Sequence, residues 1–263
     1  MLTGLILSSI FGLIVGSFLN VCIYRFPKNQ SIVFPASHCP SCNTPIKFYD
    51  NIPLLSYIIL RGKCRACGKQ ISLRYPAVEF ITGLLTAVFY YQWHWNLPWL
   101  VISLLAVYTL IVVSAIDFET MMISDLFSVI LVTLGLAGSP FNPCFDGLTW
   151  YANLGQSALG LAAGGGSIWL LAVLGKAIYK RDAVGEGDIF LMGAIGSLCG
   201  WEGVITTVTM ASFFGSVYGI SLMVLKKADR LSSMPFGPFL AIGAAINLYN
   251  LIEPSWFATL FAI

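Results

Sequence analysis

Residues 80–116, FITGLLTAVFYYQWHWNLPWLVISLLAVYTLIVVSAI, form a run of 37 residues that contains no Asp, Glu, Lys or Arg. A helix needs about 20 apolar residues to cross a bilayer, so this run is long enough for two crossings. His94 to Pro98 gives a natural turn between them. The stretch 189–225 has the same length, is interrupted only by Glu202, and predicts a second helical hairpin.

The composition places the whole chain in the membrane class. Of its 263 residues, 57% are hydrophobic and only 10% are charged. A soluble domain is about 25% charged, which excludes a soluble enzyme and a disordered chain. The net charge of +2 gives no indication of nucleic-acid binding. We therefore predict an all-α polytopic membrane protein with about eight transmembrane helices. The predicted helices are 2–24, 76–93, 98–116, 123–140, 153–175, 189–201, 203–225 and 237–261.

The basic residues predict the orientation of these helices. Eight helices have seven connections, which alternate between the two sides of the membrane, and all 14 basic residues fall on one side. The positive-inside rule makes that side cytoplasmic and both termini external. Eight of the 14 lie in the long connection 25–75: Arg25, Lys28, Lys47, Arg61, Lys63, Arg65, Lys69 and Arg74. The others are Lys176, Lys180, Arg181, Lys226, Lys227 and Arg230.

The predicted domains are a first transmembrane helix (1–24), a cytoplasmic insert (25–75) and a seven-helix membrane core (76–263). The first helix has no basic segment before it and no A-x-A site before the insert, so we interpret it as a retained helix and not as a signal peptide. Small residues four apart predict close helix packing within the membrane part. These are Gly12 and Gly16, Gly160 and Gly164, and Gly215 and Gly219. The sequence indicates no internal repeat.

The insert carries two CxxC pairs, Cys39-Pro40-Ser41-Cys42 and Cys64-Arg65-Ala66-Cys67, separated by 21 residues. This spacing is typical of a zinc site. Four thiolates would complete a tetrahedral shell with no open position, which makes the site structural and not catalytic. A vestigial or redox pair and disulfides stay as alternatives, although a cytoplasmic location disfavours disulfides. Iron is also possible, and we favour zinc because the loop is exposed and its four-sulfur shell is closed.

Acidic residues at the membrane edge are candidates for catalysis, because a charge within a bilayer is costly. The topology places Asp117 and Asp188 together at the cytoplasmic edge. Two carboxylates that share a site hold one proton between them, so one can activate water while the other acts as an acid. Each could instead be an interfacial anchor or a helix N-cap. Gly185 and Gly187 would let a backbone come close to Asp188.

Two further acids are supporting candidates. Asp125 follows Ser124 and is expected as an N-cap of the helix that begins there. Glu79 lies near the start of the second predicted helix.

Several motifs together resemble the type IV prepilin peptidases, also called prepilin leader peptidase/N-methyltransferases, which are membrane aspartyl proteases of the GxGD type. The resemblance covers nearly the whole chain, and six motifs occur in the family's order. They are Gly16-Ser17-Phe18-Leu19-Asn20-Val21 with Tyr24-Arg25; the cysteine loop from Ser37 to Cys64; Tyr75-Pro76-Ala77-Val78-Glu79; Asp117 followed by Asp125; Gly185-Glu186-Gly187-Asp188; and Pro235-Phe236-Gly237-Pro238-Phe239.

The resemblance implies a bifunctional enzyme of the bacterial cytoplasmic (inner) membrane. It would use Asp117 and Asp188 to cut the basic leader of type IV prepilins or type II secretion pseudopilins on the cytoplasmic side. It would then methylate the new N-terminus with S-adenosylmethionine, whose binding residues the sequence does not reveal. Ser124 stands where the family usually has Pro, and Phe190 where many members have Lys. The second departure bears on substrate preference or on methylation.

Three rival interpretations stay open. An ion-coupled transporter also carries intramembrane Asp residues, but its sites lie near the midplane, and no inverted repeat is evident here. A peptidase without methyltransferase activity is a second alternative. An inactive homologue that serves as an assembly scaffold is the third, and the presence of both Asp117 and Asp188 argues against it. The expected partners are pilin substrates and membrane lipid, with no nucleic acid; the sequence leaves the oligomeric state open.

Overall fold

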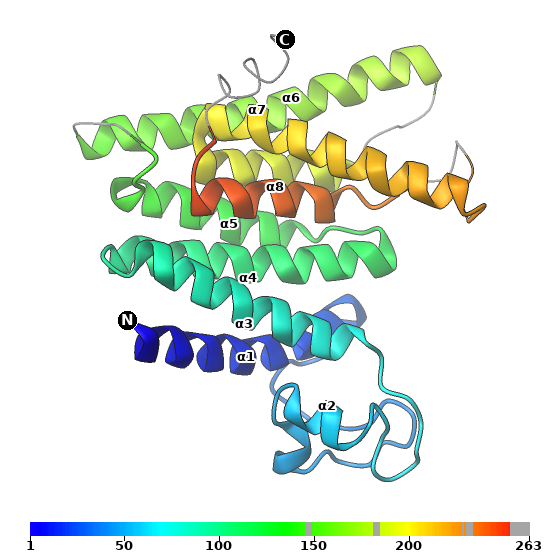
Figure 1. Ribbon diagram of the computed structural model, residues 1–263. Coiled ribbons are helices and arrows are strands. Elements are labelled where there is room, and N and C mark those ends of the chain that lie inside the picture. Colours follow the sequence, from blue (N-terminus) through cyan, green and yellow to red (C-terminus); the bar gives the residue numbers. More distant parts are fainter. Residues whose placement is uncertain (146–148, 181–184, 228, 230–233, 253–263) are drawn as a thin grey trace. The chain divides into compact units, whose positions relative to one another are not determined.

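The computed structural model of the protein describes residues 1–145, 149–180, 185–227, 229 and 234–252 (Figure 1). The chain divides into two compact units, Met1–Trp95 and Asn96–Ile263. The described residues form helices and loops, with only isolated β-bridges between extended segments. The predicted three-part division follows the order of the chain and stays a prediction. In the structure, the helix that follows the insert belongs to the same compact unit as the first helix.

Unit 1 is built on two packed helices, α1 (Leu2–Arg25) and α3 (Arg74–Trp93). Their close approach depends on small residues, because a Cβ added to Gly12 would lie 2.9 Å from the Cα of Gly83, and one added to Gly16 would lie 2.8 Å from the Cα of Glu79. The small-residue spacing predicted from the sequence therefore does mark a helix–helix contact here.

The insert between these two helices is mostly loop. It contains two short 3₁₀ turns, η1 (Phe26–Lys28) and η2 (Phe48–Asn51), and one short helix, α2 (Leu55–Ile59). Leu54, at the N-cap of α2, has a positive φ of 58° and donates its N–H to the Glu79 carboxylate at 2.9 Å. Glu79 therefore ties the insert to the helix pair.

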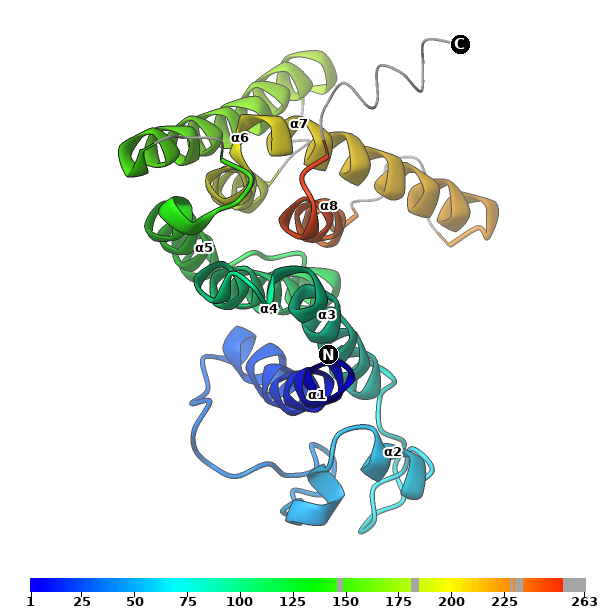
Figure 2. The same cartoon turned by 60° about the vertical axis from the view of Figure 1, so that its left-hand side comes forward.

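Unit 2 contains α4 (Leu97–Thr120), α5 (Asp125–Gly138), η3 (Ser139–Phe141), α6 (Trp150–Tyr179), α7 (Glu186–Val224) and α8 (Gly237–Tyr249). The predicted turn before α4 is present: the Asn96 side chain accepts the Trp99 N–H, and Pro98 lies in the first turn. Figures 1 and 2 show α8 beside both α4 and α7, and these helix pairs are in contact.

The 39-residue α7 is two helices joined at Gly200, whose φ of 70° and ψ of 179° are not helical. The chain reverses at this glycine, because a Cβ added to Gly196 would lie 3.0 Å from Cγ2 of Val204, eight residues further on. In a continuous helix eight residues span about 12 Å. This confirms the hairpin expected around Glu202. The first half packs on α6, where Gly160 faces Gly196 and Gly164 faces Met192.

Four helices, α1, α4, α6 and α7, are long and apolar enough to cross a membrane, while Asp125–Phe141 and Gly237–Tyr249 are shorter apolar helices. The described part of the chain is therefore all-helical, its long apolar helices indicate a membrane protein, and eight spans remain a prediction. The boundary predicted for the last helix is wrong, since α8 ends at Tyr249 and Asn250 is extended. Residues 253–261 of that predicted helix lie outside the described part, as do Arg181 and Arg230.

Candidate active site and metal centre

Asp117 lies in the last turn of α4 and is 4% exposed. The helix ends just after it because Met121 adopts a left-handed conformation and donates its N–H to the Asp117 carbonyl at 2.8 Å. Its carboxylate reaches a second helix, since Oδ2 accepts the backbone N–H of Gly237 at 3.0 Å in a buried hydrogen bond. Gly237 is the first residue of α8. One side chain thus connects the end of α4 with the start of α8.

Asp188 lies in the first turn of α7, three residues after the N-cap Gly185. Its N–H donates to the Gly185 carbonyl at 3.1 Å. A helix N-terminus favours negative charge, so this position suits a carboxylate. Its Oδ1 is buried and has no hydrogen-bond partner among the residues that the structure describes. A buried carboxylate oxygen of this kind is available to a water molecule or a substrate.

The two acidic side chains belong to one site. They are close enough to interact electrostatically. Ile123 connects their surroundings: a Cβ added to Gly187 would lie 2.8 Å from Cβ of Ile123, and one added to Gly237 would lie 3.3 Å from its Cδ1. The loop between α4 and α5 therefore packs against both glycines. The site lies where the end of α4 meets the starts of α7 and α8.

The glycines near Asp188 differ in what surrounds them. At Gly187 an added Cβ would press on Ile123, so a side chain there would push the start of α7 away from the α4–α5 loop. At Gly185 an added Cβ would meet only Asp188 Oδ2, at 3.3 Å. The predicted close approach of backbone is thus a property of Gly187. Gly237 has no place among the site residues predicted from chemistry, and only its Pro-Phe-Gly-Pro motif signalled it.

The other acidic candidates and Phe190 have different surroundings. Asp125 is exposed in the first turn of α5, and the N-cap residue is Ser124, so the expectation that Asp125 caps this helix is wrong. The Asp125 charge still lies at the favourable end of the helix dipole. Glu79 belongs to unit 1, where it holds Leu54. Phe190 is 57% exposed on α7.

The four cysteines of the insert lie together. Each offers a sulfur within 4.8 Å of the other three, and the Sγ atoms of Cys39 and Cys67 are 4.0 Å apart. Four sulfurs about 2.3 Å from a tetrahedral zinc ion would be about 3.8 Å apart. The donor set and its spacing therefore fit one metal ion with a four-thiolate shell.

The cluster is built from one motif used twice, with an offset of 25 residues. In each copy the backbone carbonyl of the first cysteine accepts the N–H of the residue four positions on, which is Asn43 or Gly68. These two residues have positive φ angles of 56° and 71°. A β-bridge closes each turn, His38 with Pro45 and Lys63 with Gln70. The insert thus contains an internal repeat that the sequence analysis missed, because the two copies share little beyond their cysteines.

The cysteines of the cluster differ in how readily they lose a proton. Hydrogen bonding to Thr44 lowers the pKa of the Cys42 thiol to about 6. At Cys67, a backbone hydrogen bond with Lys69 lowers the pKa, but desolvation and the neighbouring thiols raise it to about 11. Four thiolates repel one another, and a bound metal ion removes that repulsion.

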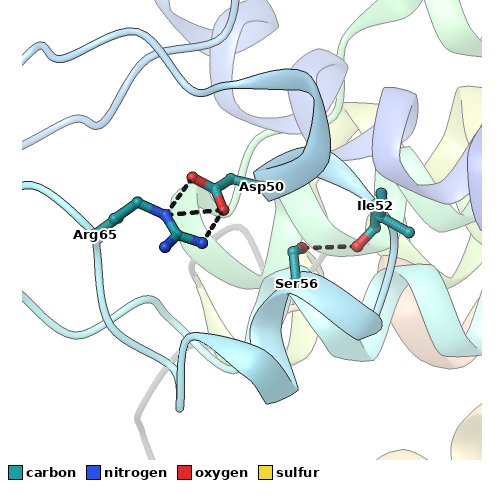
Figure 3. A network of polar contacts seen from close by, with 4 residues as sticks. All are labelled: Asp50, Ile52, Ser56 and Arg65. Atoms are coloured by element: carbon teal, nitrogen blue, oxygen red, sulfur yellow. Dashed lines mark hydrogen bonds and ion pairs between the residues drawn. The ribbon is translucent and has the colours of Figure 1, made fainter.

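A surface ion pair joins the second cysteine turn to the rest of the insert (Figure 3). Arg65 Nε donates to Asp50 Oδ2 at 2.8 Å, and its Nη2 donates to Oδ1 at 2.6 Å. Hydrogen bonding from Arg65 lowers the pKa of Asp50. Nearby, the Ser56 hydroxyl donates to the Ile52 carbonyl at 2.7 Å and supports the start of α2.

The described helices thus bring two acids to one junction, and the insert brings four cysteines together. Residues 104–220 match the type IV leader peptidase family, and residues 10–93 match the bacterial peptidase A24 N-terminal domain. The chain belongs to the type IV leader peptidase family, which confirms the resemblance predicted from its motifs.

Curated relatives align along most of the chain. The prepilin leader peptidase/N-methyltransferase of Pseudomonas aeruginosa is 33% identical over 91% of this chain and 88% of its own length. The protein of the same name from Neisseria gonorrhoeae is 32% identical over 95% of this chain and 91% of its own length. No solved structure matches the chain.

Proposed function

We propose that the chain removes the leader peptide of prepilins by a two-aspartate mechanism and methylates the new N-terminus. The protein is an enzyme, since it belongs to a peptidase family and its curated relatives are named prepilin leader peptidase/N-methyltransferase. The observation that carries the peptidase mechanism is the junction of α4, α7 and α8. There a buried Asp117, held by Gly237, interacts with Asp188, whose Oδ1 is buried and unpartnered among the described residues.

The chemistry needs two carboxylates in different protonation states. One takes a proton from water, and the water oxygen adds to the scissile carbonyl carbon. The other, protonated, gives its proton to the leaving nitrogen as the carbon–nitrogen bond breaks. Gly237 orients Asp117 through its N–H, while Oδ1 of Asp188 is open to the water or to the substrate. We leave the choice of base open, because the contacts of the two acids fit either order.

The proposed topology delivers the substrate to these acids. We propose eight spans, with α7 contributing two of them through its reversal at Gly200, and with the shorter α5 and α8 contributing one each. A helix below 20 residues can be accommodated by local thinning of the bilayer. Basic residues after α1, α6 and α7 would then lie on the cytoplasmic side and both termini outside. The substrates would be type IV prepilins or type II secretion pseudopilins of the inner membrane.

We propose zinc as the metal of the insert, held by Cys39, Cys42, Cys64 and Cys67. When bound, it would supply folding energy to a segment with few regular elements. It would supply no catalytic chemistry. Four cysteine ligands would leave such an ion no open coordination position, so the insert would act on the enzyme only through its fold.

S-adenosylmethionine would supply the methyl group for the new amine. A cavity in unit 1 is of suitable size for such a ligand, about 570 Å³. Its lining does not fit the donor, however, because Arg25 is the one charged residue among those that line it, and the donor carries a cationic sulfonium. We therefore assign no residues to the methyl donor.

The test is to incubate the purified enzyme with a prepilin and methyl-labelled S-adenosylmethionine. Loss of the leader with transfer of label to the mature pilin is the expected result. Leader loss without label would reduce the activity to that of a peptidase. If several prepilins stay intact with folded, metal-loaded enzyme, the peptidase proposal is wrong. Uptake of ions into vesicles would then test the transporter alternative.

A further inference from the structure

A cavity that opens to the surface of unit 1 lies between α1 and the insert. Its wall on α1 comes from one face of the helix, at positions three, four and seven residues apart, and its opposite wall comes from two loops of the insert. The α1 residues are Ile14, Ser17, Phe18, Val21 and Arg25. The loop residues are Ile32, Val33, Pro35, Ala36, Ser37, Asn51, Ile52 and Pro53.

The cavity follows the apolar span of α1. Ile14 and Arg25 are 11 residues apart, which at 1.5 Å per residue is about 16 Å along the helix axis. The hydrocarbon core of a bilayer is about 30 Å thick, so the cavity extends alongside a large part of the membrane-embedded helix. Ile14 and Phe18 are 57% and 50% exposed on this face. A cavity of this length with mainly apolar walls is suited to hydrocarbon and not to water.

The end of the cavity near Arg25 is polar. The Arg25 guanidinium is buried and donates to the Ser31 carbonyl at 2.9 Å and to the Pro35 carbonyl at 2.7 Å, which holds the loop wall in place. These bonds involve two of its five N–H donors, so it can also donate to a phosphate oxygen. Ser37 and Asn51 add further hydrogen-bonding groups to the lining.

The charge of the insert favours a ligand with an anionic headgroup. Residues 25–75 hold eight basic residues and one acidic residue, Asp50, a net charge of +7 (8 − 1). A zinc ion with four thiolates contributes −2, which leaves +5. Basic residues close to an anionic leaflet are attracted to it. The same positive charge disfavours the cationic sulfonium of a methyl donor.

We propose that this cavity binds one anionic phospholipid of the cytoplasmic leaflet. One acyl chain lies against Ile14, Phe18 and Val21, and the phosphate lies beside Arg25. The lipid fills the space between α1 and the insert and holds the metal-binding insert against the membrane. The assignment to the cytoplasmic leaflet rests on the proposed topology; it does not depend on the aspartate mechanism.

The test measures lipid retention by the full chain in native mass spectrometry. The enzyme is moved from nanodiscs into mild detergent and titrated with phosphatidylglycerol or with phosphatidylcholine of the same acyl chains. Val21→Trp fills the slot, and Phe18→Glu places a charge where the acyl chain lies. Ile10→Trp is the matched control, since Ile10 is 49% exposed on α1 but outside the cavity lining. Bound zinc reports that the insert of each variant is folded.

The expected result is one phosphatidylglycerol per chain, retained at least tenfold more tightly than phosphatidylcholine. Val21→Trp and Phe18→Glu should each weaken retention at least tenfold, and Ile10→Trp should leave it unchanged. Equal retention of the two lipids, or equal retention by wild type and both cavity variants, would overturn the proposal. The same titration with S-adenosylmethionine adds a third arm. Loss of that ligand in the cavity variants, with phosphatidylglycerol retained, would assign the cavity to the methyl donor instead.

Discussion

Gly237→Ala should slow cleavage while leaving the fold in place, because Gly237 meets Asp117 with no space for a side chain. A Cβ at residue 237 would lie 2.8 Å from Oδ2 of Asp117 and 3.3 Å from its Cγ. Moving that Cβ to an ordinary contact of about 3.4 Å needs a shift of about 0.6 Å (3.4 − 2.8). A shift of that size along the hydrogen bond would lengthen the N···Oδ2 distance of 3.0 Å to about 3.6 Å, which is no longer a hydrogen bond.

The expected loss follows from the energy of that bond. A hydrogen bond to a charged group contributes about 1.5–3 kcal/mol. If the bond orients Asp117 in the transition state, its loss lowers kcat/KM by about 10- to 150-fold. The loss should appear mainly in kcat, because the bond involves the catalytic group and not the substrate.

The assay follows leader removal by mass spectrometry with wild type, Gly237→Ala and Gly155→Ala. Gly155 is the matched control, since a Cβ there meets nothing within 4 Å. It lies inside α6, where Ala is a better helix former than Gly. A Gly237→Ala enzyme that cleaves within twofold of wild type would refute the orienting role of this backbone N–H. A variant that also loses its thermal transition would indicate a folding defect instead.

Three other regions allow sharp tests. Cys39→Ser should remove the bound metal and unfold the insert, measured as the loss of one zinc per chain by elemental analysis, whereas Cys22→Ser, outside the cluster, should keep it. Gly160→Leu should lower the melting temperature, because a side chain at residue 160 would collide with the Gly196 carbonyl, whereas Gly166→Leu meets open space and should not. Asn247→Ala should lower the free energy of unfolding by about 1–3 kcal/mol. The buried Asn247 amide forms hydrogen bonds with Thr206, Thr207 and Gly243, and the substitution would leave these groups without that partner. An unchanged denaturation midpoint would contradict this prediction.

The helices of the membrane part were predictable because their signal is composition. A long run without charges, such as 80–116, has few alternatives to a pair of helices, and Asn96 and Pro98 mark the turn by ordinary capping chemistry. The reversal within 189–225 was predictable because the charged Glu202 interrupts the apolar run close to Gly200. The end of the last helix was not, because residues 250–252 are nearly as apolar as α8 itself.

The candidate site was predictable in part. An acid in an apolar sequence is conspicuous, so Asp117 and Asp188 could be singled out without a structure. Gly237 could not be found by its chemistry, because its contribution is a backbone N–H, which every residue except proline carries. The repeat in the insert was hidden for a similar reason: it is a repeat of backbone turns, and Asn43 and Gly68 satisfy the same left-handed position with different residues.

The central claim is that Asp117 and Asp188 act together in peptide hydrolysis. The most direct measurement is leader removal from a prepilin by wild type, Asp117→Asn, Asp188→Asn and, as the matched control, Asp125→Asn. The control residue is exposed in the first turn of α5 and lies in the same unit. We predict no detectable cleavage by the first two variants, with their zinc and thermal transition retained, and cleavage near the wild-type rate by Asp125→Asn. Cleavage by a folded Asp117→Asn or Asp188→Asn enzyme would contradict the account.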